Sequence, residues 1–267
     1  MRRPDYTLRT LRKGLEVLEA FNMGSGDLTL TELSRRLQES PTVVFRLVRT
    51  LEEHGYVVRD PASKRYSLGL RIWEIGRKAL GRLGLTDLGR PVLKWLTEVT
   101  GETSYLAVVR GTDTIYVDVV EGSEALRVYA EPGFRVPLYL TASGKAILAF
   151  SGSDLARDVI RAGMKRLTPT TITSARALRA RLDEIRRTGL SVNQGERRPD
   201  ISAVAAPILD RTGECIAAIG VSGPSSRFTE ERRERIADSV RKAAEELSTK
   251  LGHVVAGQTV RPQREQR

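Results

Sequence analysis

Apolar residues in the first quarter of the chain recur with the period of short helices. Over residues 7–23, 30–37 and 44–51 they lie three or four positions apart, which predicts three amphipathic helices that each bury one stripe. Residues 56–59 and 65–68 then read as two short strands around a turn of Asp, Pro, Ala and Ser, which predicts a β-hairpin. Helix, turn, helix and hairpin together predict a winged helix-turn-helix.

The expected helix ends support that prediction. Thr29 followed by Glu32 matches a capping box, and Ser40 followed by Pro41 matches an N-cap with proline in the first turn. Gly55 is placed to end the helix that begins at Pro41. In such a fold this helix enters the major groove of DNA, and the hairpin contacts phosphates.

Beyond the hairpin the pattern predicts a helical connector and then an α+β domain. Residues 70–86 are expected to join the two domains, residues 1–69 and 87–252, and residues 253–267 to form a disordered polar tail. The order of elements indicates an antiparallel sheet with helices packed on it. The expected helices are 70–83, 86–100, 141–150, 153–163, 174–189 and 229–251, and the expected strands are 103–111, 114–122, 125–133, 190–195, 201–209 and 215–223.

Composition narrows the class of protein. The 267-residue chain is 40% hydrophobic and 29% charged, and no apolar run approaches the roughly 20 residues that span a bilayer. The first residues lack an apolar signal core and there is one cysteine, so we expect a cytoplasmic protein without a membrane partner. The net charge of +11 suits a polyanionic partner and is denser in residues 1–82, with 16 Lys and Arg against 10 Asp and Glu. An arginine-rich composition with solvated faces explains the charge equally well.

Two blocks of sequence resemble the IclR family of bacterial transcriptional regulators. The first, FRLVRTLEEHGYVVRD followed by RYSLG, is similar to the family's recognition helix and wing. The second, GLSVNQGERRPDISAVAAPILDRTGECIAAIGVSGPSSRFT, is similar to its C-terminal signature, and PLYLTASGKAILA matches a third family segment. The resemblance covers about residues 6–251. It implies a winged helix-turn-helix, a connecting helix and a GAF-like effector domain, and homodimers or dimers of dimers on double-stranded operator DNA that respond to small organic acids.

The turn between the two DNA-reading helices departs from the family pattern. Gln38-Glu39-Ser40-Pro41 stands where the family usually has Gly-Leu-Pro-Lys. A missing glycine costs up to about 1 kcal/mol if its position needs a positive φ. Thr42-Val43 replaces the family's Ser-Thr pair, which removes one hydroxyl from the start of the recognition helix.

The DNA-contacting residues are expected on the exposed face of the recognition helix and around the wing. Arg46 and Arg49 can reach guanine edges or phosphates, although either can instead pair with Glu52 or Glu53 on the same helix. The other basic residues are expected at phosphates, which position the protein without reading sequence, or merely in solvent. The predicted set is Arg35, Thr42, Val43, Phe45, Arg46, Arg49, Arg59, Lys64 and Arg65.

The resemblance also implies an effector site in the C-terminal domain. Where relatives that bind polar acids carry Asp, Cys and Ser, this chain has Asn193, Ala203 and Gly220, which favours a larger or more apolar acid, such as an aromatic one. Small residues in these strands are explained equally well by sheet packing. The helix start at residues 141–145 offers backbone N–H groups to a carboxylate. The predicted effector-binding residues are Leu138, Asn193, Ile201, Ala203, Gly220 and Ser222.

Other chemistry finds no support in the sequence. Two histidines and one cysteine cannot build the usual Cys/His zinc site, so His54 is expected at a helix end and Cys215 packed in a strand. We find no nucleophile–base arrangement and expect neither an enzyme nor a cofactor. The hypothesis is a ligand-responsive transcriptional regulator. The alternatives are an enzyme or metabolite-binding module whose helix-turn-helix serves assembly, and a constitutive DNA-binding protein without a live effector site.

Overall fold

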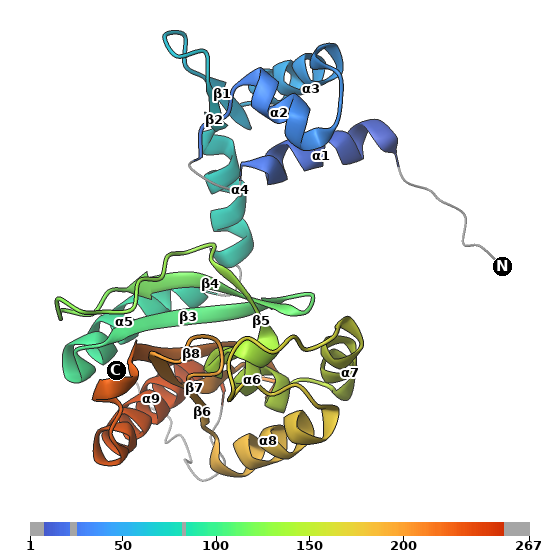
Figure 1. Ribbon diagram of the computed structural model, residues 1–267. Coiled ribbons are helices and arrows are strands. Elements are labelled where there is room, and N and C mark those ends of the chain that lie inside the picture. Colours follow the sequence, from blue (N-terminus) through green and yellow to red (C-terminus); the bar gives the residue numbers. More distant parts are fainter. Residues whose placement is uncertain (1–7, 22–25, 82–83, 254–267) are drawn as a thin grey trace, which may run out of the picture. The chain divides into compact units, whose positions relative to one another are not determined.

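The chain forms two compact units, residues 1–82 and 83–267, each built around its own apolar core (Figure 1). The structure is a computed structural model that describes residues 8–21, 26–81 and 84–253. The predicted tail after residue 253 and the predicted ends of the first helix, Thr7 and Met23, lie outside the described residues. The boundary between the units falls inside the predicted connector, residues 70–86.

The N-terminal unit is a winged helix-turn-helix. Its core is formed by one apolar stripe from each of the first three helices, closed by Val57 and Tyr66 of the hairpin. The two strands pair antiparallel, with Val57 opposite Leu68 and Arg59 opposite Tyr66. The elements are α1 (Arg9–Ala20), α2 (Leu30–Leu37), α3 (Pro41–Glu53), β1 (Val57–Arg59), β2 (Tyr66–Leu68) and α4 (Leu70–Gly81).

Local hydrogen bonds explain where these helices begin. Glu32 N donates to Thr29 Oγ1 over 3.2 Å while Thr29 N donates to Glu32 Oε2 over 2.7 Å, so the predicted capping box is confirmed. Ser40 Oγ accepts from the N–H of Val43, and Pro41 occupies the first turn of α3. Gln38 ends α2 with a φ of 52°, so the position where the family has glycine does need the left-handed region.

The C-terminal unit is an α+β domain around one six-stranded sheet. All neighbouring strands pair antiparallel in the order β5-β4-β3-β8-β7-β6. The predicted fold class is therefore confirmed. The elements are α5 (Leu85–Thr100), β3 (Thr103–Arg110), β4 (Asp113–Val120), β5 (Arg135–Pro137), the short 3-10 helix η1 (Leu138–Leu140), α6 (Ala142–Phe150), α7 (Ser153–Ala162), α8 (Ala175–Thr188), β6 (Ser191–Gln194), β7 (Ile201–Leu209), β8 (Cys215–Pro224), η2 (Ser225–Arg227) and α9 (Glu230–Lys250).

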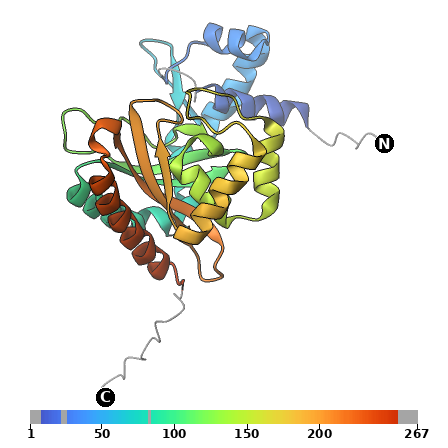
Figure 2. The same ribbon diagram turned by 60° about the horizontal axis from the view of Figure 1, so that its bottom comes forward.

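Helices cover both faces of this sheet. The long helices α5 and α9 pack on one face (Figure 2). They bury the largest apolar cluster, which includes Leu93, Leu96, Ile219 and Leu247. Helix α6 packs on the other face against β7 and β8, and α8 packs outside α6. The small side chains of β7 and β8, predominantly alanine, let α6 approach the sheet closely.

The strand predicted over residues 125–133 is wrong. That segment has no strand pairing, and the next strand, β5, begins only at Arg135. Pro132 has no N–H to give to a sheet, and Gly133 adopts a φ of 90° in a turn where Phe134 N donates to Glu131 O. The segment is held instead by scattered hydrogen bonds. Thr103 Oγ1 donates to Val128 O and Arg227 Nη2 donates to Leu126 O, each over 2.8 Å, and Gly133 N donates to Tyr116 O over 2.7 Å.

Candidate functional site

Helix α3 presents a polar and aromatic face to solvent. Val44 and Val48 are fully buried on one side of it, whereas Thr42, Phe45 and Arg46 on the other side are exposed. Phe45 is 45% exposed, which is unusual for a phenylalanine in a small domain. Val43 is half-buried and therefore sits at the margin of this face rather than on it.

The two arginines of this face differ in their partners. Arg49 pairs with Glu52 at 3.1 Å and with Glu53 at 3.6 Å, which is the pairing within the helix that the sequence offered as the alternative to DNA contact. Arg46 is exposed, and its side chain has no ion pair within the part of the chain that the structure describes. Of the two, Arg46 is the guanidinium that can reach a base edge without first giving up a carboxylate.

The wing presents its cations in an equally uneven way. Arg65 Nη2 donates to Asp27 O over 2.9 Å and lies 3.1 Å from Glu32, so this residue ties the wing to the start of α2. The Arg59 guanidinium lies 5.7 Å from the centre of the Tyr66 ring. Lys64 stands exposed at the tip with a φ of 57°. Lys64 is thus the wing cation best placed for a phosphate.

The tip itself is held by hydrogen bonds to the Asp60 side chain. Ser63 Oγ donates to Asp60 Oδ2 over 2.5 Å and Ala62 N donates to Asp60 Oδ1 over 2.9 Å. These hydrogen bonds stabilise the carboxylate and hold the pKa of Asp60 below its ordinary value. Arg35, the remaining predicted contact, is exposed on α2. Whether these residues touch DNA stays a prediction.

A cavity that opens to solvent lies in the C-terminal unit between the sheet and the start of α6. Its wall is aromatic on the side of β3 and β4. Tyr105 and Tyr116 stack with ring centres 4.7 Å apart, and Phe134 lies 6.0 Å from Tyr116. Such a wall suits a flat apolar ring, because aromatic pairs gain from offset stacking beyond the area they bury.

The two tyrosines keep neutral hydroxyl groups in this wall. Burial raises the pKa of Tyr105 well above its ordinary value and raises that of Tyr116 to about 12. Both hydroxyls interact with the side chain of Ser143 in α6, which stabilises their charged forms only in part. Near neutral pH they can therefore donate hydrogen bonds as phenols but cannot serve as bases.

Two arginines stand at the cavity on the loop between β6 and β7. Arg198 forms an ion pair with Asp200 at 2.9 Å. Arg197 is half-buried, lies 4.8 Å from the centre of the Phe134 ring, and has no carboxylate partner among the described residues. Arg197 exerts an attractive electrostatic effect on the ionised form of Tyr116. The cavity thus has an aromatic wall with one unneutralised cation beside it.

Four of the six predicted effector residues line this cavity: Asn193, Ile201, Ala203 and Ser222. Leu138 is fully buried in the core beneath α6, and the cavity is lined by Leu140 two residues later. Gly220 is also buried, and a Cβ there would lie 2.7 Å from Val204 O, so a side chain at this position would force its neighbours to shift. Effector contact by any of the six stays a prediction.

Asn193 has a structural task beside the cavity. Its Nδ2 donates to Leu140 O over 2.8 Å, and its Oδ1 accepts from Glu196 N over 3.2 Å. The side chain thereby joins the end of β6 to η1. Nearby, Thr141 caps α6 by accepting from Gly144 N over 2.9 Å, while Thr141 and Ala142 line the cavity. The start of α6 therefore does face the cavity.

Sequence reasoning missed Tyr105, Tyr116, Phe134 and Arg197. A signal for the tyrosines was present, because a hairpin over the turn at residues 111–113 pairs Ala107 with Tyr116 and so places Tyr105 diagonally on the same face. Phe134 and Arg197 belong to loops, and no periodicity could place them beside that face.

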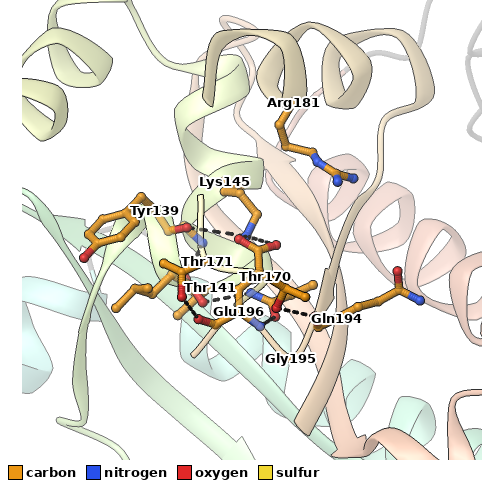
Figure 3. Close-up of polar contacts among 12 residues, drawn as sticks. Tyr139, Thr141, Lys145, Thr170, Thr171, Arg181, Gln194, Gly195 and Glu196 are labelled. Carbon is orange, nitrogen blue, oxygen red and sulfur yellow. Dashed lines mark hydrogen bonds and ion pairs between the residues drawn. The ribbon is translucent and has the colours of Figure 1, made fainter. Parts of the chain in front are cut away.

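A buried ion pair joins α6 to Glu196, the residue before the cavity-lining Arg197 (Figure 3). Lys145 Nζ of α6 lies 2.9 Å from both carboxylate oxygens of Glu196 and donates to Tyr139 O over 3.5 Å. The Lys145 side chain is fully buried and that of Glu196 is 6% exposed. Burial lowers the pKa of Lys145, and the adjoining Glu196 carboxylate opposes that shift.

The remaining candidate chemistry is absent or inert in the described ranges. No group of three or more His, Cys, Asp or Glu side chains could hold a metal ion there. Burial raises the pKa of the Cys215 thiol to about 12, which disfavours a reactive thiolate. His54 ends α3 with its Nδ1 2.8 Å from Thr50 O, at the helix end where it was expected. No helix among the described residues is long and apolar enough to cross a membrane.

Comparison with known proteins agrees with this arrangement. Residues 77–249 match the family model described as bacterial transcriptional regulator IclR C-terminal, and residues 10–61 match that of the IclR helix-turn-helix domain. The chain is 36% identical to the HTH-type transcriptional regulator BhcR of Paracoccus denitrificans over 90% of this chain and 86% of that protein. It is 32% identical to the HTH-type transcriptional regulator KdgR of Escherichia coli over 94% and 95% of the two chains.

Solved structures give the same answer. The IclR protein of Thermotoga maritima superposes with a TM-score of 0.74 at 34% identity, and the match covers 92% of this chain and 100% of that one. An IclR homologue from Microbacterium hydrocarbonoxydans, solved in complex with 4-hydroxybenzoate, superposes with a TM-score of 0.83 at 25% identity over 91% and 98% of the two chains. A DNA-reading unit and an effector-binding domain thus occur here in one known combination, and the chain belongs to the IclR family of bacterial transcriptional regulators.

Proposed function

We propose that an aromatic carboxylic acid binds in the cavity beside β3 and β4 and controls the affinity of α3 for operator DNA. The observation that carries this proposal is the pairing of the aromatic wall with the unneutralised cation of Arg197. A ring can lie against Tyr105 and Tyr116 while a carboxylate reaches the guanidinium.

The composition of the cavity favours this ligand class over a small keto acid. Ala203 and Ile201 add apolar wall, and the amide of Asn193 already has partners on both its oxygen and its nitrogen. A small polar acid would leave the aromatic wall in contact with water. The Microbacterium homologue, crystallised with 4-hydroxybenzoate, provides independent support for the class of ligand.

On the DNA side, Arg46 is proposed to read a base edge and Lys64 to contact a phosphate. Arg46 is exposed on the outer face of α3, and Lys64 stands at the tip of the wing. Operators of such proteins are read by two copies of the helix, so we propose a homodimer or a dimer of dimers. Leu8, Leu11 and Leu15 are 71%, 61% and 54% exposed along α1 and its N-cap, and a second copy would cover them.

Calorimetric titration of the intact protein tests the ligand class. We expect 4-hydroxybenzoate to bind at least about tenfold more tightly than pyruvate, since only the former can use the aromatic wall. Ala203→Leu, which adds volume at the cavity wall, should abolish binding of 4-hydroxybenzoate while leaving affinity for operator DNA unchanged. Tighter binding of pyruvate than of 4-hydroxybenzoate would contradict the ligand class. Unchanged binding of 4-hydroxybenzoate by Ala203→Leu would show that the site lies elsewhere.

A further inference from the structure

The loop between β6 and β7 carries both arginines of the cavity, and its start is held by three threonine side chains. Thr171 Oγ1 donates to Glu196 O over 2.7 Å (Figure 3). Thr168 Oγ1 donates to Gly195 O over 2.7 Å. Thr170 Oγ1 donates to Gln194 O over 3.1 Å. Three consecutive carbonyls at the start of the loop are thus fixed by the segment that precedes α8.

The buried pair of Lys145 and Glu196 completes this anchorage. Lys145 projects from α6 toward the loop, and its ammonium group lies equally close to both Glu196 oxygens (Figure 3). Arg181 of α8 points toward the same region and adds a like charge that Glu196 offsets. A buried ion pair adds little net stability compared with apolar residues of the same size, because desolvation offsets the attraction. Its presence here calls for a role in orientation.

The residues that follow Glu196 in the chain, Arg197 and Arg198, line the cavity. Arg197 follows Glu196 without an intervening residue, and its guanidinium lies over Phe134. On the other side of Glu196, Gly195 has a φ of 69°, and a Cβ there would lie 3.2 Å from Pro199. The direction in which Arg197 projects is therefore set by residues 195 and 196 together.

We infer that the Lys145–Glu196 pair is a positioning device that holds Arg197 where it reads the carboxylate of the effector. This inference rests on the proposed function, in which the effector is an aromatic acid. Lys145 and Glu196 do not touch the ligand in this account. They act through Arg197, and the predicted consequence is selectivity for a charged ligand over a neutral one of the same shape.

Two ligands and three variants test the inference in the full-length protein. The ligands are 4-hydroxybenzoate and its neutral analogue 4-hydroxybenzamide, and the variants are Glu196→Gln, Arg197→Gln and the double variant carrying both. Glu184→Gln, which removes an exposed carboxylate 3.3 Å from Arg181 on α8, is the matched control. Lys145→Met combined with Glu196→Leu removes both buried charges while keeping apolar volume, and it carries the test if Glu196→Gln does not fold.

We expect Glu196→Gln to weaken binding of 4-hydroxybenzoate by about 10- to 100-fold, the range for loss of one charged hydrogen bond, and to leave 4-hydroxybenzamide within about twofold. In the Arg197→Gln background, Glu196→Gln should cause no further loss, and Glu184→Gln should have no effect. Equal weakening of both ligands, or additive losses in the double variant, would show a merely structural pair and overturn the inference.

Tryptic cleavage of the Arg197–Arg198 bond, located by mass spectrometry, provides a readout that needs no ligand. Loss of the anchor should accelerate cleavage at this bond in Glu196→Gln and in the apolar double variant, but not in Glu184→Gln. If the wild-type protein binds neither ligand while cleavage accelerates, the proposed ligand class is wrong and the anchor stands. If the wild-type protein prefers the acid while cleavage stays unchanged, the anchor is wrong and the ligand class stands.

Discussion

The two units of this regulator place their arginines in opposite environments. On α3, Arg46 and Arg49 are exposed, and Arg49 pairs with two carboxylates on its own helix. At the cavity, Arg197 is half-buried against Phe134, and the loop that carries it is anchored by a fully buried lysine. A DNA-reading face can leave its cations mobile because the phosphates provide most of the attraction. A small-molecule site must fix the cation that meets its ligand, because the ligand offers few contacts to select an orientation.

The largest effect that separates the two regions is expected on stability. Lys145→Met leaves the Glu196 carboxylate buried without its partner and should lower the free energy of unfolding by about 3–5 kcal/mol. Arg49→Ala removes exposed ion pairs on α3 and should lower it by less than about 1 kcal/mol. Urea denaturation of both variants measures the difference. Equal destabilisation would remove the contrast between a buried anchor and a solvated face.

Close packing of the sheet against its neighbours gives the next effect. Gly220→Ala places a Cβ 2.7 Å from Val204 O and 2.8 Å from Tyr105 Oη, so we expect overpacking to cost about 1–3 kcal/mol. Gly14→Ala is the control, because Gly14 lies inside α1 and a Cβ there meets nothing within 4 Å. The control should stabilise the protein slightly. A Gly220→Ala protein as stable as the wild type would show that β8 has room for an additional cavity wall.

On the DNA-reading face we expect effects on binding rather than on folding. Arg46→Ala should weaken binding to the cognate operator by about 1–3 kcal/mol and relax sequence preference, because it removes a contact to a base edge. Lys64→Ala should weaken binding to specific and to random DNA about equally. It should also reduce the slope of log affinity against log salt concentration by about one, because one phosphate contact is lost. Titrations at several salt concentrations measure both. An Arg46→Ala protein with unchanged affinity and preference would refute the assignment of α3.

The smallest expected effect concerns the turn between α2 and α3. Gln38→Gly removes a side chain from a position with a φ of 52° and should raise the free energy of unfolding by up to about 1 kcal/mol. Operator affinity should stay the same, because Gln38 lies at the end of α2 rather than on the outer face of α3. Thermal unfolding and DNA titration of the same variant check both statements. Destabilisation would indicate that the Gln38 side chain makes a contact worth more than the strain.

These regions also differ in how far the sequence predicts them. The helix-turn-helix depends on local signals, and the caps at Thr29 and Ser40 appear in the structure as predicted. The sheet follows from the alternation of its strands, except over residues 125–133, where Pro132 and Gly133 interrupt a pattern that looked like a strand. Local propensity cannot distinguish a segment held mostly by side chains, such as those of Thr103 and Arg227, from a paired strand.

The cavity is harder to predict because its parts come together only by tertiary packing. Alignment to the family placed Asn193 and Ala203 at its wall, since both lie on the paired strands β6 and β7. It could not find Arg197, whose place depends on a contact between Lys145 and Glu196, 51 positions apart in sequence. Leu138 was displaced from the wall because η1 turns its neighbour Leu140 toward the cavity instead.

The central claim is that ligand binding in the cavity and DNA binding by α3 are coupled. Calorimetric titration of 4-hydroxybenzoate into the intact protein, with and without a saturating cognate operator, tests it directly. Thermodynamic linkage requires the operator to change ligand affinity by the same factor by which the ligand changes operator affinity, and such factors are typically about 5- to 150-fold. We predict matching factors in that range. Ligand affinity that is the same with and without operator would contradict the account and identify a constitutive DNA-binding protein.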